Sequence, residues 1–207
     1  ETITTGPGMK IFPAVMRDGR IFYSDMTVAM NAWSVDARPD EAVVSANPRK
    51  LTQDLMQNFN PSISRDGARV AFSAFGGAQE ARIEVRVKDI KTGVDRTIPV
   101  QAINIGQVPR LSPDGSLLAY RDVVGGRAGA YIVAPGASTG RELCEGCIVL
   151  GFLPDNNYAL VQSKPGELEK MDLRTKERTS VLSSGQDAIE DASLSPDQRA
   201  DMVIEQM

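Results

Sequence analysis

The 207-residue chain contains no histidine. Catalysis by Ser-His-Asp or Cys-His groups, and metal sites built on histidine, are therefore excluded within this sequence. Carboxylate chemistry and oxygen-ligated cations are not excluded by this absence. No apolar run approaches the ~20 residues that a membrane-spanning helix needs, so we expect no membrane span. We recognise no signal peptide either, although such a segment can be removed before the mature numbering begins.

An excess of basic charge is also missing. The chain carries 23 Lys and Arg against 27 Asp and Glu, a formal net charge of −4. Proteins that bind nucleic acid present a basic face, so this balance predicts no nucleic-acid partner. We find no run with 3.6-residue periodicity, which argues against a helical repeat. With 42% hydrophobic residues, the chain can bury the core of a single all-β domain.

A short turn motif is the most informative feature that is present. In Ser112-Pro113-Asp114-Gly115, the proline ring fixes φ at about −65°, which suits the first central position of a tight turn. Asp114 can accept hydrogen bonds from backbone groups two residues on, and Gly115 accepts a positive φ. The flanks, 110–112 and 117–120, are apolar-rich and predict a β-hairpin. We interpret the aspartate as a turn residue rather than a ligand or an acid–base group.

Similar turns recur along the chain. Their aspartates, at positions 18, 66, 114, 155 and 197, lie 48, 48, 41 and 42 residues apart. Asparagine, the next-best residue for a positive φ, replaces glycine in the fourth copy. The structural turn residues are therefore expected to be Asp18, Gly19, Asp66, Gly67, Asp114, Gly115, Asp155, Asn156 and Asp197. Strand-dominated units of about 40–50 residues predict an all-β fold, a β-propeller of four-stranded antiparallel blades.

This spacing divides the single propeller domain, 1–207, into five units. They cover about 9–58, 59–105, 106–146, 147–190 and an incomplete 191–207. In the first unit we expect a third strand at 31–36 and a fourth at 49–52. Trp33, the only tryptophan, is expected to pack between blades; a ligand platform is the alternative.

The second unit contains the clearest alternating strand, 82–89. Ile83, Val85 and Val87 are predicted to point inward, and the charged residues between them to be solvated. Pro99 cannot donate a ladder hydrogen bond, so its strand belongs at a sheet edge. In the third unit the glycine-rich stretch 123–129 precedes a strand and not the helix that a phosphate loop needs, so we interpret it as a hairpin.

Cys144 and Cys147 are the one local pair of residues whose side chains could carry chemistry, and three interpretations compete. A zinc site would need two more Cys or His ligands that this chain lacks. A thioredoxin-type redox pair lies at a helix N-terminus, whereas these residues fall between two strands. The favoured interpretation is a structural disulfide, or two free thiols, at a crossing between blades. A disulfide would suit an oxidising compartment.

The Ser-Pro-Asp-Gly turn between two strands, and the segment 171–176 before an outer strand, resemble the TolB-like, WD-repeat-like propeller repeat. The resemblance extends from about 9 to 207. It implies a bacterial, often exported protein of the periplasm or cell envelope that binds other proteins. Related propellers cover peptidase domains or bind oligosaccharides, but their catalytic residues match nothing here, so none is carried over. Since the family usually has six or seven blades, we expect part of a larger propeller; a five-bladed ring is the alternative.

We therefore expect a non-catalytic scaffold that binds a protein or peptide partner through loops at the mouths of the propeller channel. The loops that follow second strands are 27–30, 76–81, 124–129 and 164–167. Asp187, Glu190 and Asp191 could attract a basic partner or a cation, but a solvated linker is the simpler interpretation. The alternative function is a propeller that gates or accompanies a hydrolase, peptidase or sugar-active, or a signalling domain in a longer protein. No catalytic, metal, cofactor or specific binding residue can be assigned.

Overall fold

The computed structural model describes most of the chain. The described residues are 9–15, 20–26, 29–35, 37–38, 43–44, 47–54, 56–76, 82–101, 108–137, 139–183, 189–194 and 202–206. They form strands, turns and irregular connections and include no helix, which confirms the all-β class. The chain divides into two compact units, residues 1–59 with 74–82 and residues 60–73 with 83–207. Among the described residues, no helix is available to cross a membrane.

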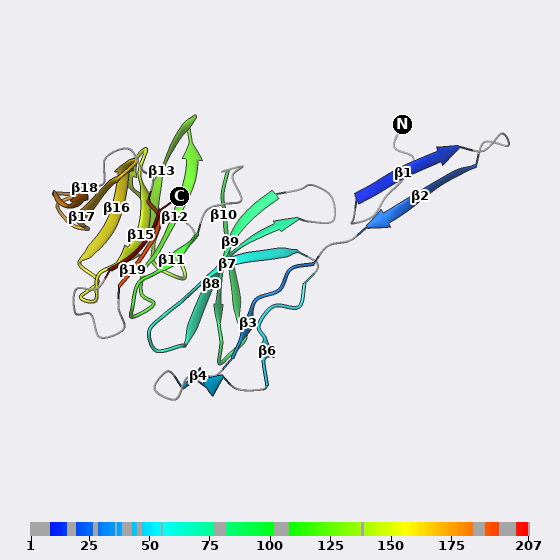
Figure 1. Cartoon of the computed structure of the whole chain (residues 1–207), viewed down its shortest axis with the longest axis horizontal. Helices are drawn as coiled ribbons and strands as arrows, with labels where there is room; N and C mark the ends of the chain where they lie inside the picture. Colours follow the sequence, from blue (N-terminus) through cyan, green and yellow to red (C-terminus); the bar gives the residue numbers. More distant parts are fainter. Residues whose placement is uncertain are drawn as a thin grey trace. The chain divides into compact units, whose positions relative to one another are not determined.

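The N-terminal strands pair as three two-stranded antiparallel sheets (Figure 1). The pairs are β1 (Met9–Val15) with β2 (Ile21–Met26), β3 (Trp33–Ser34) with β6 (Arg49–Lys50), and β4 (Ala37–Arg38) with β5 (Val43–Val44). In this part of the described chain a four-stranded sheet is not formed. The expected third and fourth strands are shortened to β3 and β6, and β4 and β5 lie in the connection between them. Pro39 and Pro48, which cannot donate ladder hydrogen bonds, stand in that connection.

Trp33 is 56% exposed, so the expectation that it packs in a core is wrong. Successive side chains of an extended segment point to opposite faces, and the inward position next to it is taken by Ala32, which is 7% exposed. The backbone N–H of Ala32 donates to the Thr52 hydroxyl at 3.0 Å. Trp33 instead pairs across the ladder with Lys50, whose Nζ lies 5.9 Å from the centroid of the indole ring.

Three four-stranded antiparallel sheets follow, and we name them blades two, three and four (Figure 1). Blade two is β7 (Gln57–Ile63), β8 (Arg69–Gly76), β9 (Arg82–Asp89) and β10 (Asp95–Pro99). Blade three is β11 (Arg110–Leu111), β12 (Leu118–Val124), β13 (Arg127–Val133) and β14 (Arg141–Glu145). Blade four is β15 (Ile148–Phe152), β16 (Tyr158–Lys164), β17 (Glu167–Asp172) and β18 (Arg178–Ser183). A last hairpin pairs β19 (Ile189–Leu194) with β20 (Met202–Gln206). In each blade, strands that follow one another in the chain are neighbours in the sheet.

Blade two shows how far the alternation of residues predicts burial. Ile83, Val85 and Val87 are buried, as predicted, and β10 with Pro99 is an edge strand of its sheet. The charged face, however, is not simply solvated, because Glu84 is only 5% exposed. Its carboxylate lies 4.0 Å from Nε of Arg86, and the Arg86 guanidinium lies 6.0 Å from the centroid of the Phe72 ring. Long charged side chains can cover apolar surface in this way while their heads stay polar.

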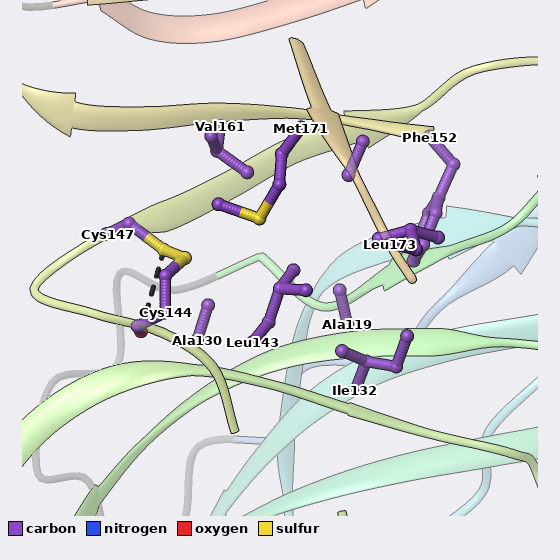
Figure 2. Packing of buried hydrophobic residues seen from close by; sticks show 11 residues of the cluster. Ala119, Ala130, Ile132, Leu143, Cys144, Cys147, Phe152, Val161, Met171 and Leu173 are labelled. Atoms are coloured by element: carbon purple, nitrogen blue, oxygen red, sulfur yellow. Dashed lines mark hydrogen bonds between the residues drawn. A yellow bond between two sulfur atoms is a disulfide. The ribbon is translucent and has the colours of Figure 1, made fainter. Parts of the chain in front are cut away.

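The core lies mainly between neighbouring blades. One buried cluster joins blades two and three through Ala71, Val85, Val87, Ile98, Leu111, Leu118, Tyr120 and Val133. A second joins blades three and four through Ala119, Ala130, Ile132, Leu143, Cys144, Cys147, Phe152, Ala159, Val161, Met171 and Leu173 (Figure 2). Leu150, Leu160 and Leu168 form a third cluster within blade four. Packing of sheet on sheet through alternate residues is what a propeller requires.

Candidate binding surfaces and the corners that position them

The turn that joins the first two strands of a blade is here called the inner corner, and in blades two and three it is held by one serine and one aspartate. In blades two and three the serine hydroxyl donates to the aspartate Oδ1, at 2.6 Å from Ser64 and 2.7 Å from Ser112. The same hydroxyl accepts the N–H five residues on, at 3.0 and 2.9 Å. Gly67 and Gly115 have φ of 68° and 67° and donate to the serine carbonyl. The side chains therefore reproduce one network at two places in the chain.

The inner corner of blade four has the same backbone path with a simpler network. Asn156 has φ of 56° and donates to the Leu153 carbonyl at 3.0 Å. The Asn157 N–H donates to Asp155 Oδ1 at 3.0 Å. Leucine stands where the other corners have serine, so the hydroxyl contacts are missing. Asp18, Gly19 and Asp197 lie outside the described residues.

A second repeated turn, the outer corner, joins the third and fourth strands of blades two and four, and the sequence reasoning missed its aspartates. Asp89 Oδ1 accepts the N–H and hydroxyl of Thr92 at 2.8 and 2.9 Å. Asp172 Oδ1 accepts the N–H groups of Arg174 and Thr175 at 2.7 and 2.8 Å. The signal that could have found them is an aspartate three residues before a threonine, followed by Gly93 or Lys176, both with positive φ.

These hydrogen bonds favour the ionised form of the corner aspartates. The Ser64 hydroxyl and then the Ala68 N–H lower the pKa of Asp66, and Thr92 lowers that of Asp89. The N–H groups of Thr175 and Arg174 lower the pKa of Asp172. At Asp114, desolvation acts to raise the pKa, but the hydrogen bonds from Ser116 and Ser112 outweigh it and the pKa is lowered. A base or an acid poised near neutral pH is the opposite case, so these are structural carboxylates.

Polar contacts tie the inner corners of blades two and three to each other. Arg69 Nη1 donates to the Gly115 carbonyl at 2.6 Å, and the Arg65 N–H donates to the Pro113 carbonyl at 2.8 Å. A Cβ on Gly115 would lie 3.3 Å from both the Arg69 Cδ and the Ser64 Cβ. The two corners are therefore in close contact, and the Arg69 guanidinium is fixed at this end of the blades.

A cavity of about 180 Å³ opens at this same end. Its lining residues come from β8, β9, β10, the outer corner of blade two and the loop after β13: Arg69, Val87, Asp89, Thr92, Val94, Arg96 and Pro135. Two guanidinium groups and one carboxylate thus meet beside aliphatic side chains. The sequence reasoning did not single out this group, because its members are spread over 67 positions, from 69 to 135.

Cys144 and Cys147 are joined in a disulfide, with 5.8 Å between their Cα atoms (Figure 2). Cys144 is the last residue but one of the outer strand of blade three, and Cys147 directly precedes the inner strand of blade four. Both are buried, at 5% and 0% exposure, within the cluster that joins the two blades. Among the described residues, no group of three or more Asp, Glu or Cys side chains is placed to hold a metal ion.

Two of the loops that follow second strands are described in full, and both are tight hairpins. In 124–127 the central residues Gly125 and Gly126 have φ of 59° and 80°, as a type I′ turn requires. In 164–167 Pro165 precedes Gly166, whose φ is 73°, as in a type II turn. Both hairpins stand at the end of their blades opposite to the corners, because the strands are antiparallel.

Charged side chains flank these hairpin tips. Arg127 lies 3.6 Å from Glu145, and Lys164 lies 3.5 Å from Glu167. The four side chains are between 43% and 72% exposed, so the ion pairs contribute little stability and remain open to a partner. The loops 27–30 and 76–81 are described only at 29–30 and 76. Asp187 lies outside the described residues, and Glu190 and Asp191 are described only as backbone of β19.

No protein-family model matches the sequence, and no curated protein matches it significantly. Solved structures do match the fold. TolB from Acinetobacter baumannii is 15% identical with a TM-score of 0.62, over 77% of this chain and 40% of that one. A protein described as putative TolB from Agrobacterium tumefaciens is 17% identical with a TM-score of 0.55, over 77% and 61%. A prolyl endopeptidase structure is 16% identical with a TM-score of 0.52, over 92% and 31%.

The chain thus spans less than two thirds of the length of each of these three proteins. At these identities the likeness concerns the fold alone. Four-stranded antiparallel blades, buried clusters between them and the two TolB matches agree with one another. The chain has the fold of a TolB-like β-propeller.

Proposed function

We propose that the chain is a non-catalytic propeller scaffold that binds a protein or peptide partner through the hairpins that join second to third strands. The observation that carries this proposal is the pair of tight, charged hairpin tips at 124–129 and 164–167. Rigid turns lose little entropy on binding, and loops held on a rigid scaffold are common binding elements. The fold shared with TolB supports a role in binding proteins.

The location that fits this proposal is the periplasm or another part of a bacterial cell envelope. A disulfide between Cys144 and Cys147 persists in an oxidising compartment and is rare in the cytosol. The TolB-like fold supports the same location. Fractionation of source cells, with the chain detected by an antibody, tests it; recovery in the cytosolic fraction with both thiols reduced would contradict it.

Photo-crosslinking tests the role of the hairpin tips. The photoreactive residue p-benzoylphenylalanine replaces Arg127 or Glu167 at the tips, or Glu177, an exposed residue at the outer corner of blade four. We expect irradiation of source cells to yield the same discrete adduct from both tips and none from position 177. Adducts of equal yield from all three positions, or from none, would contradict the proposal.

A second function is favoured by the match to a prolyl endopeptidase, which covers 92% of this chain. In this alternative the propeller accompanies a hydrolase domain in a longer protein and contributes no catalytic residue itself. The gene sequence on either side of this chain decides between the two. A hydrolase domain encoded in the same reading frame would favour the alternative, and its absence would favour the scaffold.

A further inference from the structure

We propose that the cavity between blades two and three binds a carboxylate that is attached to a small aliphatic group. The site lies at the corner end of the blades, opposite to the hairpin tips, and does not depend on the function assigned to those tips. The free C-terminus of a peptide that ends in an aliphatic residue and a short branched-chain carboxylic acid share this chemistry.

The charged side chains of the cavity favour an anion. Arg69, Arg96 and Asp89 all line the cavity, so two cations meet one anion. Asp89 is engaged by Thr92, which donates both its N–H and its hydroxyl to one carboxylate oxygen. The lining side chains alone therefore carry an excess of one positive charge, and Asp66, which does not line the cavity, lies close enough to Arg69 for the guanidinium to lower its pKa. One anionic group of single charge would balance the excess on the lining side chains.

The two guanidinium groups of the cavity differ in their contacts. Arg69 is anchored through Nη1 on the Gly115 carbonyl, which fixes the position of its other N–H donors. Arg96 is exposed, and its guanidinium makes no hydrogen bond or ion pair with the described part of the chain. Its Nη1 lies 3.3 Å from where a Cβ on Gly136 would stand, so the absence of a side chain at 136 leaves room for the guanidinium. Arg69 is thus held in place and Arg96 is left open, and a guanidinium can bind a carboxylate through two parallel hydrogen bonds.

Aliphatic side chains form most of the remaining lining of the cavity. Val87, Val94 and Pro135 give the cavity aliphatic walls, and Val94 is 52% exposed. A volume of about 180 Å³ is smaller than the roughly 300–1,000 Å³ of a typical small-molecule site. It therefore suits one small side chain with its carboxylate. A dianion such as phosphate would exceed the charge balance and would leave the aliphatic walls unused.

Calorimetric titration of the whole chain tests this inference. The probes are the peptide acetyl-Gly-Gly-Val with a free C-terminus, the same peptide as its amide, and isovalerate. We expect the acid peptide to bind at least tenfold more tightly than the amide. Affinity that is much greater for the acid peptide than for isovalerate identifies a peptide terminus, and equal affinity identifies a free acid. Equal affinity of acid and amide, or no heat from either acid up to 10 mM, would overturn the inference.

A matched pair of variants locates the site. Arg96→Gln removes the open guanidinium, and Arg174→Gln removes an exposed arginine at the outer corner of blade four that does not line the cavity. Both change the net charge equally. We expect Arg96→Gln to weaken binding of the acid at least tenfold and Arg174→Gln to leave it within twofold; equal effects would overturn the inference. Failure here with crosslinking from the hairpin tips intact would reject this site alone, and the reverse would reject the scaffold role alone.

Discussion

The junction between blades three and four and the junction between blades two and three solve one packing problem in different ways. The first is closed by 11 buried residues, and a disulfide fastens the chain where it crosses from one blade to the next. The second buries eight residues and is fastened at its rim by polar contacts, among them Arg69 to the Gly115 carbonyl. Both have an apolar centre, so the difference lies at the edges.

The residues at the edges determine whether a junction can also bind a ligand. The junction of blades three and four has charged groups at its edge as well, because Arg141 Nη2 donates to the Leu173 carbonyl at 2.8 Å and Lys176 Nζ donates to the Glu142 carbonyl at 3.1 Å. At the junction of blades two and three, Arg69 and Arg96 instead line a cavity. The two junctions thus share an apolar centre, and they differ in the groups that lie at their edges.

The largest expected effect tests whether the two apolar centres are equivalent. Leu143→Ala opens the junction of blades three and four, and Leu118→Ala opens that of blades two and three; the two leucines are 1% and 0% exposed. Each should lower the free energy of unfolding by about 2–5 kcal/mol, measured by urea denaturation. Val181→Ala, at a residue that is 44% exposed, should change it by less than about 0.5 kcal/mol. A loss below about 1 kcal/mol at either leucine would mean that the junction does not depend on its centre.

The disulfide should have the next largest effect, confined to the junction of blades three and four. The loop that it closes is short, so the chain-entropy estimate is only roughly 2 kcal/mol of unfolding free energy. We expect the double variant Cys144→Ala with Cys147→Ala to lose about that amount in urea denaturation. Mass spectrometry after alkylation in denaturant, without reductant, should find no modified cysteine in the unaltered chain. Two alkylated cysteines would show that this crossing is not covalent.

A pair of glycines isolates the close contact at the polar rim. Gly115 and Gly93 both have positive φ, 67° and 73°, so alanine is strained at either position by about 1–2 kcal/mol. A Cβ at Gly93 meets open space, whereas at Gly115 it meets Arg69 and Ser64 at 3.3 Å. We therefore expect Gly115→Ala to cost more unfolding free energy than Gly93→Ala, by up to about 1 kcal/mol. Equal costs in urea denaturation would show that the corners do not press on each other.

The architecture could be predicted because its determinants are local. A turn aspartate followed by a residue that accepts positive φ sets the ends of two strands, and repetition of that pair sets the period. Pro99 marks an edge strand because its missing N–H is a property of the residue alone. The burial of Ile83 follows equally from alternation along one strand. Each of these inferences can be made without knowing which residues pack against the strand.

The failures concern residues whose surroundings come from elsewhere in the chain. Trp33 is exposed although it is large and apolar, because Ala32 takes the inward position beside it. Glu84 is buried although it is charged, because Arg86 and the Phe72 ring cover that face of the sheet. The cavity was missed for the same reason, since Pro135 comes from the neighbouring blade. Residue types along one repeat predict its sheet, whereas the cavity depends on contacts between neighbouring blades.

Acidity provides the mildest test of the difference between the junctions. Hydrogen bonds lower the pKa of Asp66 and Asp89 in blade two, of Asp114 in blade three and of Asp172 in blade four. A carboxyl whose pKa is lower in the folded than in the unfolded chain stabilises the fold at neutral pH. That stabilisation is lost as the pH falls from about 5 through the folded pKa, because the unfolded chain then binds more protons.

Asparagine keeps the acceptor oxygen of these corners but does not titrate. We therefore expect the triple variant Asp66→Asn, Asp89→Asn and Asp114→Asn to show a smaller fall of unfolding free energy between about pH 5 and pH 3 than the unaltered chain, measured by urea denaturation at each pH. Asp172→Asn alone should reduce the fall less. An equal reduction in both would mean that the acid response does not distinguish the two junctions. A steeper fall in the triple variant would mean that the corner carboxylates are not stabilised in their ionised form.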